Sequence, residues 1–296
     1  MPRAWGERVP ACARQAARVS RESATAGPGA VLGLHHVTAI AGDPKRNLRF
    51  YTQVLGLRFV KWTVNFDDPG TYHLYYGDEL GRPGTALTFF PWPGAPRGRR
   101  GAGRWTAVAF SVPERSLGYW RDRLAAHGLG PEDADVAFGE ERLAFLDPDG
   151  LRLELVAVGD DPREPWARGP VPPEHAIRGL HGVTRLEAGY EAIARLLAEA
   201  MGLRLAAEEG ARARFAAGAG GPGALVDLVA APDAPPGLLG VGTVHHVAWR
   251  VVDEEAQRSG RAALVARGVD ATRVIDRLYF RSVYFRGAGG EIFEIA

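Results

Sequence analysis

The stretch GLHHVTAI, residues 33–40, begins with a pair of adjacent histidines at the head of an apolar run rich in β-branched residues. Such a run predicts a β-strand. Neighbouring residues of a strand point to opposite faces, so we expect only one of His35 and His36 to face a given pocket. The two imidazoles are therefore expected to have different roles.

The residues after this strand predict one helix and three further strands. Asp43 and Pro44 suit the N-cap and the first turn of a helix, and Gly56 suits its C-terminal stop. The three strand-like runs are separated by the turn sequences DDPG and GRPG; they are LRFVKWTVNF, TYHLYYGD and TALTFFPW. The predicted unit is therefore βαβββ.

The same unit recurs, with further copies starting near residues 104, 179 and 243. A proline-rich and charged stretch, DDPREPWARGPVPPEH, separates the second copy from the third and predicts a linker. The expected organisation is modules one and two in residues 33–159, a linker in 160–177, and modules three and four in 178–296.

The fold class follows from the small size of one module. A small sheet with one helix cannot cover both of its own faces, so the modules must pair. Two paired modules would form a half-open barrel around a cup-shaped cavity. The predicted fold is α+β, with four βαβββ modules that form two half-open barrels.

Aligning the four copies gives two columns of candidate metal ligands. Pairing module one with module four would bring His36, His246 and Glu294 into one cup, whereas pairing one with two would leave a single histidine in each cup. We therefore predict that module one pairs with module four around a metal. The first column is the residue just before a valine that all four first strands share; from module one to module four it is His36, Ala107, Gly182 and His246. The second column is the fourth residue after the glycine that opens each last strand; in the same order it is Thr88, Glu154, Asp227 and Glu294.

The donors in each cup indicate its chemistry. Two imidazoles and one carboxylate would leave about three coordination positions open, as in non-haem Fe(II) oxygenases. A Lewis-acid isomerase of the same architecture would use a fourth protein ligand, and Thr88 is a poor one. The second cup has no histidine in these columns, so we expect it to hold no metal, with Glu154 and Asp227 as a degenerate remnant or as solvated strand residues.

Composition points to a small partner. The 36 basic and 35 acidic side chains nearly cancel, so there is no field for nucleic acid or an anionic membrane. No apolar run approaches the roughly 18 residues of a membrane span. Cys12 is the only cysteine, which excludes an internal disulfide and suits a cytoplasmic location. Residues 1–32, rich in Ala and Arg at their start, are expected to be a flexible extension or to reflect a misplaced start of the sequence; an organelle-type targeting segment is the alternative.

Several segments resemble a known family. LHHVTAIAGDP, NFDDPGTYHLYYGD, PPEHAIRGLHGVT, VHHVAWRV and GGEIFE together resemble ring-cleaving dioxygenases of the vicinal oxygen chelate (glyoxalase/bleomycin resistance/dioxygenase) superfamily. The likeness is strongest to its hydroquinone dioxygenase branch, which includes 2,6-dichlorohydroquinone dioxygenases, and it covers about residues 32–296.

The resemblance implies a metal and a reaction. It implies Fe(II), with Mn(II) as an alternative, bound by His36, His246 and Glu294. It implies an extradiol-type ring-cleaving dioxygenase that uses O2 on hydroquinone or related phenolic rings, chlorinated ones included, and that can form a homo-oligomer. It further implies roles in catalysis for His35, His245, Arg277 and Tyr284.

The residue types suit these roles. His35 and His245 could exchange a proton with a phenol, and Arg277 and Tyr284 could hold a developing negative oxygen. The same four residues could also be ordinary packed or paired strand residues. We expect four aromatic residues of the first module to line a flat pocket: Tyr72, Tyr75, Phe89 and Trp92.

Two alternatives stay open. A glyoxalase-type isomerase or transferase could use the same fold, and so could a metal-free protein that binds an aromatic ligand or drug. Members of the family also continue past the last strand, whereas this chain stops two residues after Glu294. Weaker metal retention, or a truncated sequence, is the corresponding expectation.

Overall fold

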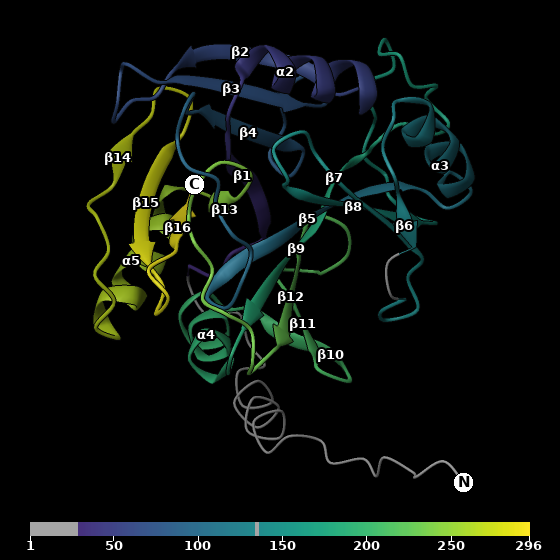
Figure 1. Ribbon diagram of the computed structural model, residues 1–296. Coiled ribbons are helices and arrows are strands. Elements are labelled where there is room, and N and C mark those ends of the chain that lie inside the picture. The colour runs from purple at the N-terminus through teal and green to yellow at the C-terminus, as the bar shows by residue number, and fades with distance from the viewer. Residues whose placement is uncertain (1–28, 134–135) are drawn as a thin grey trace, which may run out of the picture.

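The computed structural model describes residues 29–133 and 136–296 and contains the four predicted modules (Figure 1). The predicted flexible extension lies almost wholly outside the described residues, as does Cys12. Module one contains β1 (Gly33–Ala41), α2 (Pro44–Arg49), a π-helical turn η1 (Phe50–Val54), β2 (Arg58–Val64), β3 (Tyr72–Gly77) and β4 (Ala86–Pro91). Module two contains β5 (Arg104–Pro113), α3 (Leu117–Ala126), β6 (Glu132–Asp133), β7 (Arg142–Leu146) and β8 (Arg152–Val158).

The second half of the chain repeats this order. Module three contains β9 (Gly179–Glu187), α4 (Glu191–Arg195), a π-helical turn η2 (Leu196–Ala200), β10 (Arg204–Glu209), β11 (Arg212–Ala216) and β12 (Leu225–Ala230). Module four contains β13 (Val244–Arg250), α5 (Glu254–Ala266), β14 (Ile275–Asp276), β15 (Arg281–Arg286) and β16 (Ile292–Ile295).

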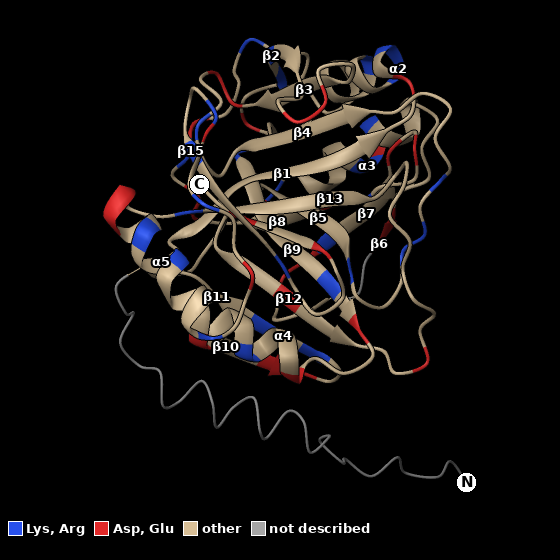
Figure 2. Cartoon of the chain, turned by 90° about the vertical axis from the view of Figure 1, so that its left-hand side faces the viewer, with Lys and Arg blue, Asp and Glu red and all other residues tan. Residues whose placement is uncertain are grey.

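The strands form two eight-stranded sheets, and each sheet joins a module from either half of the chain. The first has the order β14-β15-β16-β13-β1-β4-β3-β2, and the second β10-β11-β12-β9-β5-β8-β7-β6. In the first sheet β1 and β13 pair antiparallel, and each also pairs parallel with the last strand of its own module. Figure 2 shows β4, β1 and β13 side by side. The predicted pairing of module one with module four is confirmed. The division into residues 33–159, 160–177 and 178–296 stays a prediction.

The first helix begins and ends as its sequence predicts. The Asp43 side chain accepts hydrogen bonds from the backbone N–H groups of Lys45 and Arg46, and so caps the helix. Gly56 has φ +71°, a left-handed conformation that favours glycine at a helix end. Between them Tyr51 is fully buried and packs on Tyr76 and Phe89, with ring centroids 5.1 and 4.6 Å apart. The helix therefore covers the outer face of its own sheet.

A buried aspartate links the two sheets. Asp147, in the turn before β8, accepts a hydrogen bond of 2.9 Å from the Tyr51 hydroxyl of module one. Its other oxygen accepts from the backbone N–H groups of Asp149 and Leu151 at 2.9 and 2.8 Å. Burial raises the pKa of Asp147 to about 6, with Asp149 contributing, although these hydrogen bonds oppose the shift. The neutral acid is therefore favoured in the folded protein up to about pH 6.

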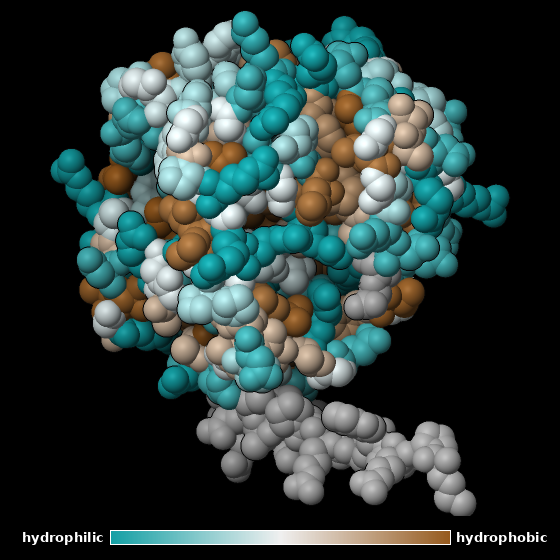
Figure 3. Space-filling view, viewed as in Figure 1, coloured by the Kyte–Doolittle hydropathy of each residue, from teal (hydrophilic) through white to brown (hydrophobic). Residues whose placement is uncertain are grey.

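The surface matches the near-neutral composition. Acidic and basic residues are both distributed over the elements that Figure 2 shows, and in α5 the acidic residues come first and the basic ones follow. On the face seen in Figure 3, hydrophobic side chains occur in small groups among hydrophilic ones. None of the helices in the described ranges is long and apolar enough to cross a membrane.

Candidate metal centre

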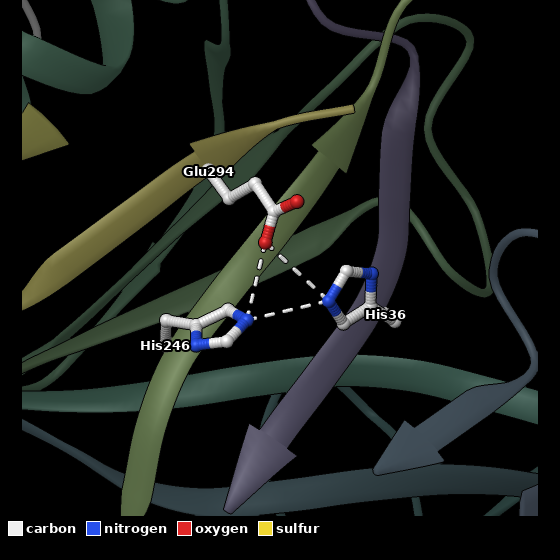
Figure 4. A group of neighbouring side chains, drawn as sticks. All are labelled: His36, His246 and Glu294. Atoms are coloured by element: carbon white, nitrogen blue, oxygen red, sulfur yellow. Dashed lines mark hydrogen bonds and ion pairs between the residues drawn. The ribbon is translucent and has the colours of Figure 1, made fainter. Parts of the chain in front are cut away.

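Three neighbouring strands of the first sheet place the three predicted ligands side by side. His36 on β1 lies opposite Ala248 of β13, and Ala248 lies beside Glu294 of β16. The Nε2 atoms of His36 and His246 are 3.3 Å apart, and they lie 3.4 and 3.1 Å from Oε2 of Glu294 (Figure 4). All three side chains are buried. Strand pairing between modules one and four therefore assembles a compact donor set.

The donor set fits a cation. Ser282 donates a hydrogen bond of 2.5 Å to Oε1 of Glu294, whereas Oε2 is buried without a hydrogen-bond donor. Burial alone would raise the pKa of Glu294, but the imidazoles of His36 and His246 hold it well below its usual value. A buried carboxylate oxygen between two imidazole nitrogens is an arrangement that a divalent metal would stabilise. In the part of the chain that the structure describes, no other group of three such residues has ligand atoms this close.

His35 and His245 lie directly behind the two candidate ligands. Nδ1 of His35 is 2.9 Å from Nδ1 of His36, and Nδ1 of His245 is 2.8 Å from Nδ1 of His246. A ligand histidine must keep its Nε2 lone pair free for a metal, so its Nδ1–H has to donate to the preceding histidine. Burial, followed by the charge of the adjacent histidine, lowers the pKa of both His35 and His245 to about 3. Both rings are therefore neutral acceptors towards the ligands.

Both histidines of each pair face the same cavity, so the expectation that only one could do so is wrong. The β1–β13 pairing shifts register between Leu34 and His36 and again at His245, so His35 and His245 have no cross-strand partner. Such a β-bulge places two consecutive side chains on one face. His181 is also an unpaired residue, in the β5–β9 pairing of the second sheet. The bulge is thus a feature of the repeated module.

The donor atoms face a cavity of about 890 Å³ between modules one and four. Arg277 and Tyr284 line it, and their roles in catalysis stay predictions. Tyr284 lies opposite Glu294 in the β15–β16 pairing, and its ring centroid is 6.1 Å from that of His246. The Arg277 guanidinium makes two hydrogen bonds, of 3.1 and 2.8 Å, to the carboxylate of Asp67. All seven predicted site residues line this one cavity: His35, His36, His245, His246, Arg277, Tyr284 and Glu294.

The aromatic lining differs from the prediction, since of the four expected residues Tyr75 alone is part of the cavity wall. Residues of β4 alternate between its two faces, so Thr88 and Phe90 face inward and Phe89 packs in the core. Phe280 was missed because it lies in a loop, where no periodicity marks it. Its ring centroid is 5.7 Å from that of His36 and 4.9 Å from that of His35. The other two expected residues lie elsewhere: Tyr72 is exposed, and Trp92 follows β4 beside His245.

Sequence reasoning also missed His73. It is buried on β3, lines the cavity, and makes hydrogen bonds through both ring nitrogens. The alternation of His73 and Tyr75 within TYHLYYGD could have identified it, because residues two apart on a strand share a face.

The second cup contains an ion-pair network. Arg142 lies 3.3 Å from Glu154, and Arg214 makes two hydrogen bonds, of 2.7 and 3.0 Å, to Asp227. The Glu140 carboxylate forms ion pairs with both guanidinium groups, 2.6 Å from that of Arg142 and 2.8 Å from that of Arg214. Glu154 and Asp227 are buried, so the alternative that they are solvated is wrong. Neighbouring arginines, which the ligand columns did not include, neutralise them.

Comparisons with known proteins agree with this architecture. The family model of the Glyoxalase/Bleomycin resistance protein/Dioxygenase superfamily matches residues 33–155. "Putative ring-cleaving dioxygenase MhqO" of Bacillus subtilis is 44% identical over 265 residues, which cover 90% of this chain and 84% of that protein. "Chlorohydroquinone/hydroquinone 1,2-dioxygenase" of Sphingobium indicum is 35% identical over 274 residues, covering 90% of this chain and 85% of that protein.

Solved structures give the same result for the fold. A Bacillus subtilis dioxygenase candidate has a TM-score of 0.85 at 43% identity, over 90% of this chain and 85% of that one. Maize glyoxalase I has a TM-score of 0.66 at 15% identity over 89% and 91% of the two chains, and supports the fold alone. The chain belongs to the Glyoxalase/Bleomycin resistance protein/Dioxygenase superfamily. Within it the chain groups with the ring-cleaving dioxygenases, and is therefore an enzyme of the dioxygenase class.

Proposed function

We propose that the protein is an Fe(II)-dependent, extradiol-type dioxygenase that cleaves hydroquinone or a related phenolic ring, chlorinated rings included. One observation supports this most directly: two imidazole nitrogens and one carboxylate oxygen converge on one side of a cavity large enough for an aromatic ring. The activity named for the Sphingobium indicum relative supports the substrate class.

The metal is proposed from its donors. His36, His246 and Glu294 would hold it by one face, and such a set with open positions is the arrangement of non-haem Fe(II) oxygenases. Mn(II) accepts the same donors. When bound, Fe(II) supplies electron transfer between an aromatic ring and dioxygen brought to one centre.

The chain's own residues bind and orient the substrate. Phe90 and Phe280 offer flat apolar surface to an aromatic ring and exclude water from the donor set. Arg277 and the Tyr284 hydroxyl carry donors for an oxygen that becomes negative during the reaction. His35, which accepts from His36 through Nδ1, has its hydrogen on Nε2 and can donate it within the cavity. The stepwise use of His35 and His245 as base and acid stays a prediction.

The two alternatives are less well supported by particular contacts. An isomerase of this architecture would use a fourth ligand, but Thr88 at that position is hydrogen-bonded to Thr38 and His73, at 2.7 and 2.9 Å. A metal-free binding protein would leave the buried Oε2 of Glu294 with the two imidazoles alone beside it, 3.1 and 3.4 Å away. A small aromatic substrate and O2 are the partners proposed here. A cytoplasmic location, a homo-oligomer and the absence of nucleic-acid or membrane partners stay predictions.

Oxygen uptake tests the proposal. The protein is loaded with Fe(II) without oxygen, and then given oxygen with hydroquinone, chlorohydroquinone or catechol. We expect consumption of one O2 per ring and loss of the aromatic absorbance with a hydroquinone. If no hydroquinone or catechol supports oxygen consumption by the iron-loaded protein, the proposed function is wrong.

A further inference from the structure

A chain of hydrogen bonds runs from the donor set across four strands of the first sheet. His246 on β13 lies opposite Thr38 of β1, Thr38 lies beside Thr88 of β4, and Thr88 lies opposite Tyr75 of β3. The Oγ1 of Thr38 is 2.9 Å from Nε2 of His246 and 2.7 Å from Oγ1 of Thr88. Thr88 is in turn 2.9 Å from Nε2 of His73, whose Nδ1 is 2.9 Å from the Tyr75 hydroxyl.

Among the hydrogen-bonded residues between His246 and Tyr75, His73 must act as a donor through one ring nitrogen and as an acceptor through the other. Its ring is buried between Tyr75 and Phe90, with centroids 4.1 and 4.4 Å away. Burial lowers its pKa well below the usual value, so the ring is neutral and carries a single N–H hydrogen. The position of that hydrogen decides the direction of the two hydrogen bonds that His73 makes, with Tyr75 and with Thr88.

The metal site is compatible with one direction that ends at the donor set. If His246 gives its Nε2 lone pair to a metal, that nitrogen has no hydrogen to donate to Thr38. The hydrogens can then run inward from the cavity wall: the Tyr75 hydroxyl donates to Nδ1 of His73, and Nε2–H of His73 donates to Thr88. Thr88 donates to Thr38, and the Thr38 hydroxyl keeps its hydrogen for the side that faces the donor set.

We propose that His73 is a positioning residue, which fixes the Thr88 and Thr38 hydroxyls so that a hydrogen-bond donor points at the open side of the metal centre. This inference rests on the proposed function, because the donor would serve an oxygen atom of the substrate or of dioxygen. His73 acts through Thr88, and so it needs no contact with the substrate or with dioxygen.

Two substitutions separate positioning from packing. His73→Gln keeps a side-chain N–H for Thr88 and an oxygen that accepts from Tyr75, whereas His73→Phe keeps the ring between Tyr75 and Phe90 without either hydrogen bond. His175→Phe is the matched control. That imidazole also contacts a hydroxyl, Ser116 at 3.1 Å, and stacks on Tyr119 at 4.3 Å, and it does not line the cavity.

The first measurement is steady-state oxygen uptake by the Fe(II)-loaded proteins, together with their iron content and melting temperature. We expect His73→Phe to lower kcat by about 10–100-fold with an unchanged iron content and a KM within about threefold, and His73→Gln to recover most of kcat. His175→Phe should change the melting temperature alone. Equal kcat in the three His73 forms, or an equal loss in His73→Gln and His73→Phe, would overturn the proposal.

The second measurement does not depend on turnover. Imidazole ¹⁵N shifts of the Zn(II)-loaded protein, a diamagnetic form, report the tautomer of His73, whose signals are identified by their loss in His73→Gln. We expect Nε2–H in the wild type and a mixture of tautomers in Tyr75→Phe. A wild type with Nδ1–H contradicts the positioning role even if oxygen uptake is observed. If oxygen uptake fails while Nε2–H is found, the proposed function is wrong and the hydrogen-bond chain stands.

Discussion

His35 and His36 face the same cavity although they are neighbours on one strand, because His35 is an extra residue of β1 with no partner on β13. The bulge brings Nδ1 of His35 within 2.9 Å of Nδ1 of His36. An acceptor behind a ligand histidine fixes its tautomer and orientation. The bulge therefore connects the strand register to the donor set.

Replacing this acceptor should weaken metal binding. We expect His35→Ala to lower Fe(II) affinity or activity by about 10–100-fold, since the Nδ1–H of His36 loses its acceptor. The control is His181→Ala, which removes the bulge histidine of the second sheet. Metal titrations that weaken equally in the two variants would show that the effect comes from general loosening of the sheets.

Adding a fourth ligand should separate metal binding from oxygen chemistry. Thr88→Glu places a carboxylate where modules two, three and four have acidic residues, beside the donor set. We expect tighter metal binding and strongly reduced oxygen uptake, because an open position becomes occupied. Thr88→Val, of similar size, controls for the lost hydroxyl. Full oxygen uptake by a Thr88→Glu variant that binds iron tightly would argue against the need for open positions.

Arg277 should matter for the reaction more than for the metal. Its two hydrogen bonds to Asp67 join the β2–β3 loop to module four beside Tyr284. Arg277→Ala should lower kcat by about 10²-fold or more if the guanidinium stabilises a negative oxygen, with iron content unchanged. Arg277→Lys should restore little, since Lys lacks the two-pronged geometry. If the Arg277→Ala variant keeps the wild-type kcat, Arg277 has a structural role alone, through its ion pair with Asp67.

The buried Asp147 should make stability depend on pH. Its folded pKa, about 6, lies above the value of 3.8 of an unburied group, so the stabilisation is complete below about pH 3.8 and is lost as the pH rises through 6. Relative to Asp147→Asn, which cannot ionise, the wild type should lose roughly 2–3 kcal/mol of unfolding free energy over this range. Urea unfolding at pH 4 and pH 7.5 measures the difference. The exposed Asp122, replaced by Asn, is the control, and parallel pH profiles for Asp147→Asn and wild type would contradict this account.

Much of the fold could be predicted from the repeats. The module boundaries follow from turn residues and periodicity, and comparison of His36, Ala107, Gly182 and His246 was enough to pair module one with module four. That comparison works because equivalent positions of repeated strands must face equivalent cups.

The features that the sequence did not predict depend on strand register and on loops. A bulge changes which face a residue occupies without changing its residue type, so nothing in GLHHVTAI distinguishes a bulged His35 from a regular one. Phe280 reaches the cavity from a loop in which Leu278 has φ +71°, and loops carry no periodicity. Arg142 and Arg214, which neutralise Glu154 and Asp227, lie on the adjacent strands β7 and β11, outside the two ligand columns.

The central claim is that His36, His246 and Glu294 form one iron site that supports oxygen chemistry. The most direct measurement is the iron content per chain, with oxygen uptake on hydroquinone, of the Fe(II)-loaded wild type beside His246→Ala. We predict one tightly bound iron and hydroquinone-dependent oxygen uptake in the wild type, and loss of both in a folded His246→Ala variant. A His246→Ala variant that keeps its iron and its activity would contradict the account.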